Sequence, residues 1–350
     1  MIAFRILRAP RDTKRVPNFS LTLFYNFSFK FAVSCAHRPS GFFTRYHGRS
    51  VLSLFEGSAV PVALAYIGVI LIWSTTPLAI KWSGEGPGWL FGVVSRMTVG
   101  AACVWLLMLV TRRRLPFDRA ACVHYAAGAL GIYGAMLLSY RGAQDIPSGW
   151  LAVLFGLSPL ATALLSRLLL GEAALSGQRL LGQALALAGL VTIYGDAGSA
   201  GDGAAFGIAL VLVAVCIHAL SGVLIKRYNA PMPALASVAG SMTLALPAYL
   251  LTWIWLDGQW PATVPLPAAL SIAWLGIVAT TAGFTLYYFI LRRQRATQVA
   301  LINFATPVFS LALGHLLNAE PLGPRILGGT ALILAGLVLH EVPLRRRQTT

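Results

Sequence analysis

Residues 158–191 read SPLATALLSRLLLGEAALSGQRLLGQALALAGLV, and the same pattern returns at 306–338 as TPVFSLALGHLLNAEPLGPRILGGTALILAGLV. Each copy has an apolar run that opens on a proline, a glutamate after that run, and a second apolar run with two glycines. The matched pairs are Pro159 with Pro307, Glu172 with Glu320, Gly182 with Gly329, and Gly189 with Gly336. Because the offset of 148 and then 147 positions is too long for a solenoid unit, half of the protein is duplicated.

The duplication extends towards the N-terminus with a nearly constant offset. The further matches are Ile80-Lys81 with Ile225-Lys226, Met97-Thr98 with Met242-Thr243, Leu130-Gly131-Ile132 with Leu275-Gly276-Ile277, and Tyr140 with Tyr288. This register sets Trp73 opposite His218, and Thr76 opposite Ser221.

The composition is that of a membrane protein. Hydrophobic residues make up 57% of the 350, and charged residues only 11%, whereas a soluble domain carries about 25% charged residues. None of the eleven acidic residues falls in the middle of an apolar run, which argues against carboxylate-bound metal or acid–base chemistry within the membrane. The four cysteines form no CxxC pair, so no zinc site is predicted. We expect no cofactor and no metal.

Ten apolar segments follow Pro61, and most reach the roughly 17–25 residues that a bilayer helix needs. They are predicted helices, because backbone groups in lipid must bond internally, and the fold class is therefore all-α integral membrane. The segments are 61–81, 88–110, 121–141, 147–168, 179–195, 204–226, 232–256, 267–291, 296–317 and 324–342.

Charge sets the orientation. With a cytoplasmic N-terminus, the outside loops carry only Lys81, Arg141 and Arg325, while the inside segments carry the other Lys and Arg residues except Arg96, which lies within a predicted span. This asymmetry also accounts for the net charge of +16 without nucleic acid. Both termini are therefore predicted to be cytoplasmic. Since each repeat has five helices, the second copy enters the membrane from the opposite side, as in many secondary transporters.

The expected domains are a first repeat at 58–199, a second repeat at 200–343 and a basic tail at 344–350. Residues 1–57 hold nine basic residues and, among the acids, only Asp12 and Glu56. Three interpretations stay open for this extension: a targeting peptide, a disordered basic arm, or a start codon assigned too early.

Several of these residues also resemble a known family. The two halves are similar to tandem EamA modules of the drug/metabolite transporter superfamily over about residues 60 to 342. The residues that carry the resemblance are Trp73-Ser74-Thr75-Thr76-Pro77, Ile80-Lys81, Arg96, Ser158-Pro159, Leu170-Gly171-Glu172 and the glycines of the following helix. The resemblance implies a ten-helix permease of the inner (plasma) membrane, often an exporter of amino acids, drugs or other small metabolites.

Polar side chains inside predicted spans are the candidates for substrate binding, because such groups are costly in lipid and face cavities. Arg96 could anchor a carboxylate or phosphate, or it could pair with helix-end carbonyls. His218 is the one histidine predicted to be well buried; it could couple protons or contact substrate, or simply bond a neighbouring helix. The predicted substrate-binding set is Trp73, Thr76, Arg96, Tyr133, His218, Ser221 and Asn303.

Two tyrosines are gate candidates. Tyr140 and its repeat partner Tyr288 are predicted near opposite ends of their helices, with Tyr133 on the same face as Tyr140. They could instead anchor the protein in the aromatic belts of the membrane interface. Glu172 and Glu320 are predicted to have structural roles at opposite membrane surfaces.

The sequence thus predicts a secondary transporter for a small molecule, acting by alternating access at the repeat interface. A carrier of nucleotide-linked or lipid-linked metabolites is the alternative within transport. An integral membrane enzyme and a channel are rivals from other classes. No Walker motif is present, which argues against ATP as the driving force, and we expect the chain not to be an enzyme. Substrate, direction, coupling ion and oligomeric state stay open.

Overall fold

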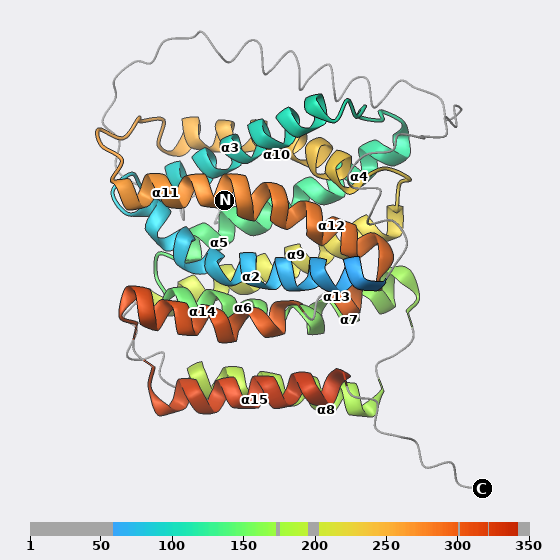
Figure 1. Ribbon diagram of the computed structural model, residues 1–350. Helices are drawn as coiled ribbons and strands as arrows, with labels where there is room; N and C mark the ends of the chain where they lie inside the picture. The colour runs from blue at the N-terminus through green and yellow to red at the C-terminus, as the bar shows by residue number, and fades with distance from the viewer. Residues whose placement is uncertain (1–58, 173–175, 195–202, 300–301, 321, 342–350) are drawn as a thin grey trace, which may run out of the picture.

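The structure, a computed structural model, describes residues 59–172, 176–194, 203–299, 302–320 and 322–341. These residues form helices joined by turns and loops, with no strand among them. The helices lie roughly parallel or antiparallel to one another in a single bundle (Figure 1). The predicted N-terminal extension at 1–57 and the tail at 344–350 fall outside the described residues.

The helices correspond segment by segment to the predicted apolar runs. They are α2 (Ala59–Gly84), α3 (Trp89–Val110), α4 (Arg119–Ala129), η2 (Leu130–Ala135), α5 (Met136–Gly142), α6 (Ser148–Phe155), α7 (Ser158–Leu170), α8 (Gly177–Tyr194), α9 (Ala204–Tyr228), α10 (Ala234–Leu256), α11 (Leu266–Trp274), η4 (Leu275–Gly283), α12 (Phe284–Arg293), α13 (Ala296–Val299), α14 (Ile302–Asn318) and α15 (Pro324–Glu341).

Seven stretches of described helix are long and apolar enough to cross a membrane. The composition predicts such membrane-spanning helices. The seven stretches are 62–84, 89–110, 119–142, 148–170, 204–228, 234–256 and 266–293. Three of them join consecutive helices end to end, as α6 and α7 do within 148–170. The remaining long helices, α8, α14 and α15, coincide with predicted segments but are not among the seven.

Two π-helices occupy matching places in the two halves. η2 begins at Leu130 and η4 begins at Leu275, which are partners in the sequence repeat. A π-helix, with hydrogen bonds from residue i to i+5, is rare and is frequently found at functional sites. Both segments face close neighbours: a Cβ on Gly131 would lie 2.5 Å from the Ser221 hydroxyl oxygen, and one on Gly276 would lie 2.6 Å from a Val99 methyl.

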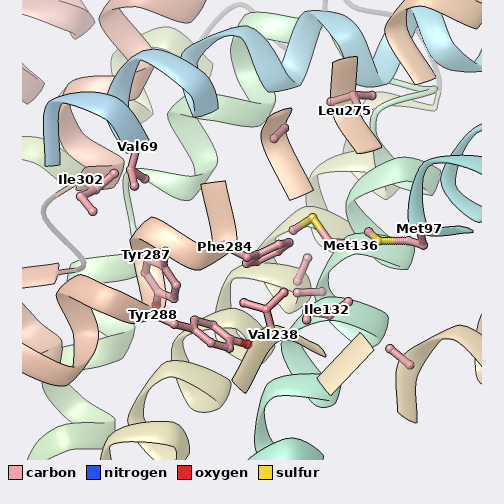
Figure 2. Packing of buried hydrophobic residues seen from close by; sticks show 14 of the residues in the cluster. Val69, Met97, Ile132, Met136, Val238, Leu275, Phe284, Tyr287, Tyr288 and Ile302 are labelled. Atoms are coloured by element: carbon pink, nitrogen blue, oxygen red, sulfur yellow. The ribbon is translucent and has the colours of Figure 1, made fainter. Parts of the chain in front are cut away.

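The two halves of the chain, 59–194 and 204–341, interlock. In the first half α2 packs against α14 of the second, and in the second half α9 packs against α7 of the first. These pairs are equivalent under the repeat. Buried residues from both halves meet in one core, where Figure 2 shows Phe284 of α12 beside Met136 of α5. Any space at the centre of the bundle is therefore shared by both repeats.

The last helices of the two halves form a pair of their own, α8 against α15, along the lower edge of Figure 1. Their contact is made by the four repeated glycines. A Cβ on Gly336 would lie 2.5 Å from the Gly182 carbonyl oxygen, and one on Gly189 would collide with the Gly329 carbonyl. Because 182 meets 336 and 189 meets 329, the two helices run in opposite directions, with their backbones in close approach.

Candidate functional site

A cavity of about 70 Å³ lies at the centre of the bundle, between the two halves. The first half contributes residues of α2, α3, α5 and α6, and the second contributes residues of α9, α12 and α14. The lining residues are Trp73, Thr76, Pro77, Ile80, Arg96, Met136, Ser139, Leu151, Ala152, Phe155, His218, Phe284, Asn303 and Thr306.

The cavity is small in this conformation. A space of this size holds a few water molecules, whereas small-molecule sites usually measure roughly 300–1,000 Å³. The walls are chiefly apolar with a small number of polar groups, which is the composition of a ligand site. A metabolite therefore needs the surrounding helices to move apart.

Arg96 brings a full positive charge to this cavity. Its side chain is only 1% exposed, and its Nε donates to the Thr280 hydroxyl oxygen at 3.0 Å. Its Nη1 is buried and has no hydrogen-bond partner among the described residues. No acidic residue lines the cavity in the part of the chain that the structure describes. A buried guanidinium without a negatively charged partner is costly, and a carboxylate or phosphate is the group whose geometry it matches.

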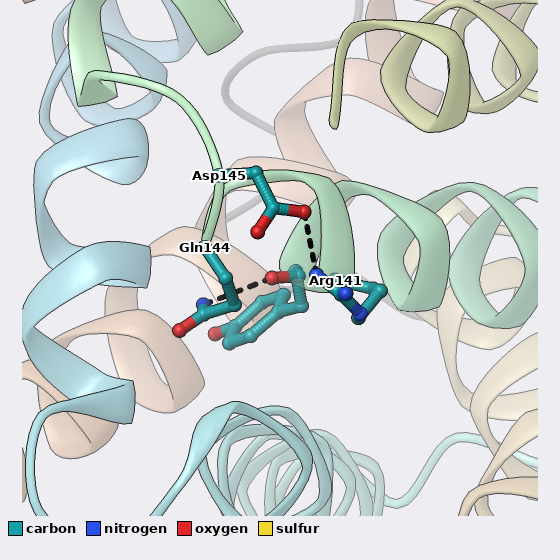
Figure 3. Close-up of polar contacts among 4 residues, drawn as sticks. Arg141, Gln144 and Asp145 are labelled. Carbon is teal, nitrogen blue, oxygen red and sulfur yellow. Dashed lines mark hydrogen bonds and ion pairs between the residues drawn. The ribbon is translucent and has the colours of Figure 1, made fainter. Parts of the chain in front are cut away.

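Tyr140 lies beside this charge. The Arg96 guanidinium carbon lies 5.8 Å from the centre of the Tyr140 ring, and the buried Tyr140 hydroxyl also lacks a partner within the described residues. The loop that follows is fixed in place: Arg141 pairs with Asp145 at 2.7 Å, and Gln144 donates to the Tyr140 carbonyl (Figure 3). Two unpartnered donors therefore lie on neighbouring side chains.

Aromatic rings make up another wall. Trp73 contacts Phe284 and His218 with ring centres 5.9 and 6.0 Å apart, and Phe155 lies 5.7 Å from His218. Tyr287 lies behind them, 5.1 Å from Trp73. Trp73 and His218 are repeat partners, so the two halves meet ring to ring here. Such a wall suits an apolar or aromatic body rather than a strongly hydrated one.

Five of the seven predicted binding residues line the cavity: Trp73, Thr76, Arg96, His218 and Asn303. Ser221 does not. Its hydroxyl donates to the Ala127 carbonyl, and it borders a much smaller hollow one helical turn away, with Tyr287 and Tyr288. That hollow also shares His218 and Phe284 with the cavity.

Tyr133 is the other predicted residue outside the lining. It bonds the Thr252 hydroxyl at 2.6 Å and packs its ring on Tyr249, both in α10. Tyr140, by contrast, faces Arg96 in α3. The expected shared face of Tyr133 and Tyr140 stays a prediction.

Tyr140 and Tyr288 are both buried, at 0% and 2% exposure. Exposed anchoring in an aromatic belt therefore does not describe them. A Cβ added to Gly128 would lie 2.8 Å from the Tyr288 hydroxyl and would also collide with Ser241. Ser241 occupies the repeat position of Arg96. The two gate candidates therefore lie near equivalent positions of the two repeats, Tyr140 beside the charge of Arg96 and Tyr288 near Ser241.

Glu320 closes one end of the bundle, here called the Glu320 end. Its carboxylate accepts from the Ser148 backbone N–H at 3.1 Å, the Ser148 hydroxyl at 2.7 Å and the Gly149 N–H at 3.3 Å, all at the start of α6. Asn318 also donates to it and accepts from the Trp82 indole of α2. Burial alone would raise the pKa of the Glu320 carboxyl, but these hydrogen bonds outweigh burial and hold the pKa below its ordinary value.

The opposite end, here called the Glu172 end, repeats the arrangement with fewer bonds. Glu172 accepts from the Thr297 hydroxyl at 3.3 Å and lies 3.5 Å from the half-exposed Arg295 guanidinium. Arg227, the repeat partner of Trp82, donates to the Leu169 carbonyl. Each glutamate therefore links the end of its own helix to the helix start in the other half, which refines the structural role predicted for both.

Sequence reasoning missed some residues. His124 is buried at 1% exposure and bonds Ser237, so His218 is not the one buried histidine. Thr280, whose hydroxyl accepts a hydrogen bond from Arg96, was not predicted either. The same is true of Phe155 and Phe284 in the aromatic wall. The place of Thr280 in the π-helix could not be read from hydrophobic spacing, which fits α-helix equally well.

The family model for the EamA-like transporter family matches residues 60–195 and again residues 205–340. The chain belongs to this family. The two matches divide the EamA protein into the same two halves that meet at the cavity.

Curated relatives agree with this assignment. An uncharacterised transporter of Bacillus subtilis is 25% identical over 83% of this chain and 99% of its own length. A probable amino-acid metabolite efflux pump of Salmonella typhimurium is 30% identical over 50% of this chain and 61% of its own length. An S-adenosylmethionine/S-adenosylhomocysteine transporter of Chlamydia trachomatis is 25% identical over 77% and 86%.

The fold is also known from experiment. A crystal structure superposes with a TM-score of 0.64 at 21% sequence identity, covering 81% of this chain and 99% of the other. At this identity the likeness concerns the fold alone. Together with the family matches and the seven apolar helices, it makes this EamA protein a multi-pass membrane protein of a transporter family.

Proposed function

We propose that this EamA protein is a secondary active transporter that exports small metabolites, amino acids or drugs across the inner (plasma) membrane by alternating access. The names of its relatives support this proposal, since they include an efflux pump for amino-acid metabolites and a probable exporter of terminal-alkyne amino acids. The energy source is a gradient rather than ATP, because the chain has no Walker motif.

The proposed architecture is ten spans arranged as two inverted repeats, 58–199 and 200–343, with both termini cytoplasmic. The opposite directions of α8 and α15 support the inversion, as does the matched placing of η2 and η4. The excess of Lys and Arg at the Glu172 end supports the orientation. The Glu320 end is then external and the Glu172 end cytoplasmic.

One observation carries the proposal: a buried arginine, whose Nη1 has no hydrogen-bond partner among the described residues, lines a small cavity between the two halves. In inverted-repeat transporters the substrate site lies at the repeat interface near the midplane, and the halves rock about it. Arg96 would bind the anionic group of the substrate, Trp73 and His218 would enclose its body, and Thr76 and Asn303 would orient it. Tyr140 and Tyr288 remain the gate candidates on the two sides.

The alternative within transport is a carrier of nucleotide-linked or lipid-linked metabolites. The chlamydial relative supports this alternative, because the substrates in its name contain a nucleoside. A guanidinium suits a phosphate as well as a carboxylate. An integral membrane enzyme is the less supported rival, because no acidic side chain reaches the cavity among the described residues.

A vesicle screen tests the proposal. Everted and right-side-out membrane vesicles with and without the EamA protein are loaded with amino acids, nucleosides and common drugs, and movement is followed in each direction. Protein-dependent, saturable accumulation in everted vesicles under an ion gradient is the expected result. Flux that does not saturate, or electrical conductance in planar bilayers, would instead indicate a channel.

A further inference from the structure

We propose that the central cavity selects organic monoanions with an apolar, ring-sized body, in preference to zwitterions and cations of the same skeleton. This inference rests on the proposed function and names the substrate class of its site. It starts from the charge of Arg96, which among the described residues is the only Lys or Arg lining the cavity and has no acidic partner there.

The net charge of the loaded site separates the three substrate classes. The acidic residues that the structure describes lie at helix ends or in loops, as Asp145 and Glu320 do, and those two are already bonded there. A monoanion therefore brings the site to neutrality. A zwitterion leaves it with the charge of the empty site, and a cation adds a second positive charge. Charge uncompensated in a low-dielectric interior is unfavourable.

The other polar groups of the cavity do not change this order. The hydroxyls of Thr76 and Ser139 donate to the carbonyls of Ile72 and Ala135 within their own helices. Their free lone pairs could accept from an ammonium, but they are neutral and leave its charge unbalanced. An ammonium in this cavity would thus exchange full hydration for a few neutral acceptors beside a guanidinium, which is a net loss.

The body of the substrate follows from the opposite wall. Trp73, Phe155 and Phe284 present ring surfaces, with the His218 ring among them. Ring faces and edges bind another flat apolar group by stacking and by edge-to-face contact. Figure 2 shows Phe284 pointing towards Met136, so flexible side chains complete this wall. A substrate that places a carboxylate at Arg96 and a ring at this wall is an aryl-alkyl carboxylate.

Three probes that share a phenyl-ethyl skeleton test the inference: 3-phenylpropionate, phenylalanine and 2-phenylethylamine. Calorimetric titration of the purified full-length protein measures their affinities. We expect 3-phenylpropionate to bind at least about tenfold more tightly than phenylalanine, and 2-phenylethylamine to bind most weakly. Arg96→Gln should weaken 3-phenylpropionate by about tenfold or more, while Arg96→Lys keeps the charge and the order of the probes.

Arg141→Gln is the matched control, because Arg141 lies outside the cavity and pairs with Asp145. This variant should bind all three probes as the native protein does. Equal or tighter binding of phenylalanine would overturn the inference yet leave the proposed transport intact. Absence of binding by 3-phenylpropionate, or binding unaffected by Arg96→Gln in a folded protein, would also overturn it. Failure of the vesicle screen, by contrast, would refute transport itself.

Discussion

Replacing Glu320 by glutamine is expected to open the external end of the protein. The carboxylate accepts four hydrogen bonds, three of them from Ser148 and Gly149 at the start of α6 and one from Asn318. Glutamine keeps one acceptor oxygen but turns an amide N–H₂ towards donors. It also removes a negative charge from a helix N-terminus, a favourable position for an anion.

The size of the effect follows from these contacts. Hydrogen bonds to charged acceptors contribute roughly 1.5–3 kcal/mol each and those to neutral ones roughly 0.5–1.5 kcal/mol. Glu320 is partly exposed, so solvent competes for the same bonds and the sum must be reduced. A net loss of about 2 kcal/mol from the closed state is a reasonable expectation. It corresponds to an increase of about thirtyfold in the ratio of open to closed external ends.

The assay is maleimide labelling of a cysteine placed at Thr76, in a chain whose native cysteines are replaced. Thr76 lines the small central cavity, so an increase in labelling by a membrane-impermeant reagent added to intact cells reports wider opening of the external end. Glu320→Gln should raise the labelling rate. Glu172→Gln is the matched control, with only a 3.3 Å bond to Thr297 and a 3.5 Å contact to Arg295. Equal labelling in both variants, or no change with Glu320→Gln, would refute the reasoning.

Three further predictions concern pH, packing and topology. Because the pKa of Glu320 is lowered from its ordinary 4.5, its contribution to closure is complete above that value and is lost as external pH falls through the lowered pKa. The labelling rate at Thr76→Cys, divided by that of a fully exposed cysteine at the same pH to remove the loss of thiolate, should therefore rise in acid, and a flat ratio would contradict this. Gly336→Val should separate α8 from α15 and lower the thermal midpoint, whereas Gly328→Val on the same helix, with open space around it, should not. Reporter fusions after Thr350 and within 111–120 should behave as cytoplasmic and one near Asp202 as external; the reverse pattern would refute the orientation.

Much of the fold was predictable because its signals are local and repeated. Apolar length marks the helices, and the duplicated Pro–Glu–Gly pattern marks equivalent positions in the two halves. The glycines of α8 and α15 could be matched by sequence, and the structure gives them a physical reason in the close backbone contact. The count of ten spans stays a proposal, since α8, α14 and α15 fall outside the seven long apolar helices.

The site was predictable only in part. Polar side chains in the middle of a span, and their partners in the repeat, were the basis for predicting Trp73, Arg96 and His218. All three line the cavity. Tyr133 does not line the cavity, because its side chain contacts Thr252 and Tyr249 of α10. Thr280 could not be found, because its bond to Arg96 joins residues far apart in the chain.

Alternating access itself is most directly tested by measuring distances at both ends of the protein in one membrane preparation. Spin-label pairs at Glu85 and Leu317 report the external end, and pairs at Tyr228 and Leu168 report the cytoplasmic end; all four side chains are exposed. Pulsed electron–electron double resonance should give a short and a long distance between the two labels at each end. Glu320→Gln should increase the long external population and decrease the long cytoplasmic one. Distances that stay fixed, or that lengthen at both ends together, would contradict alternating access.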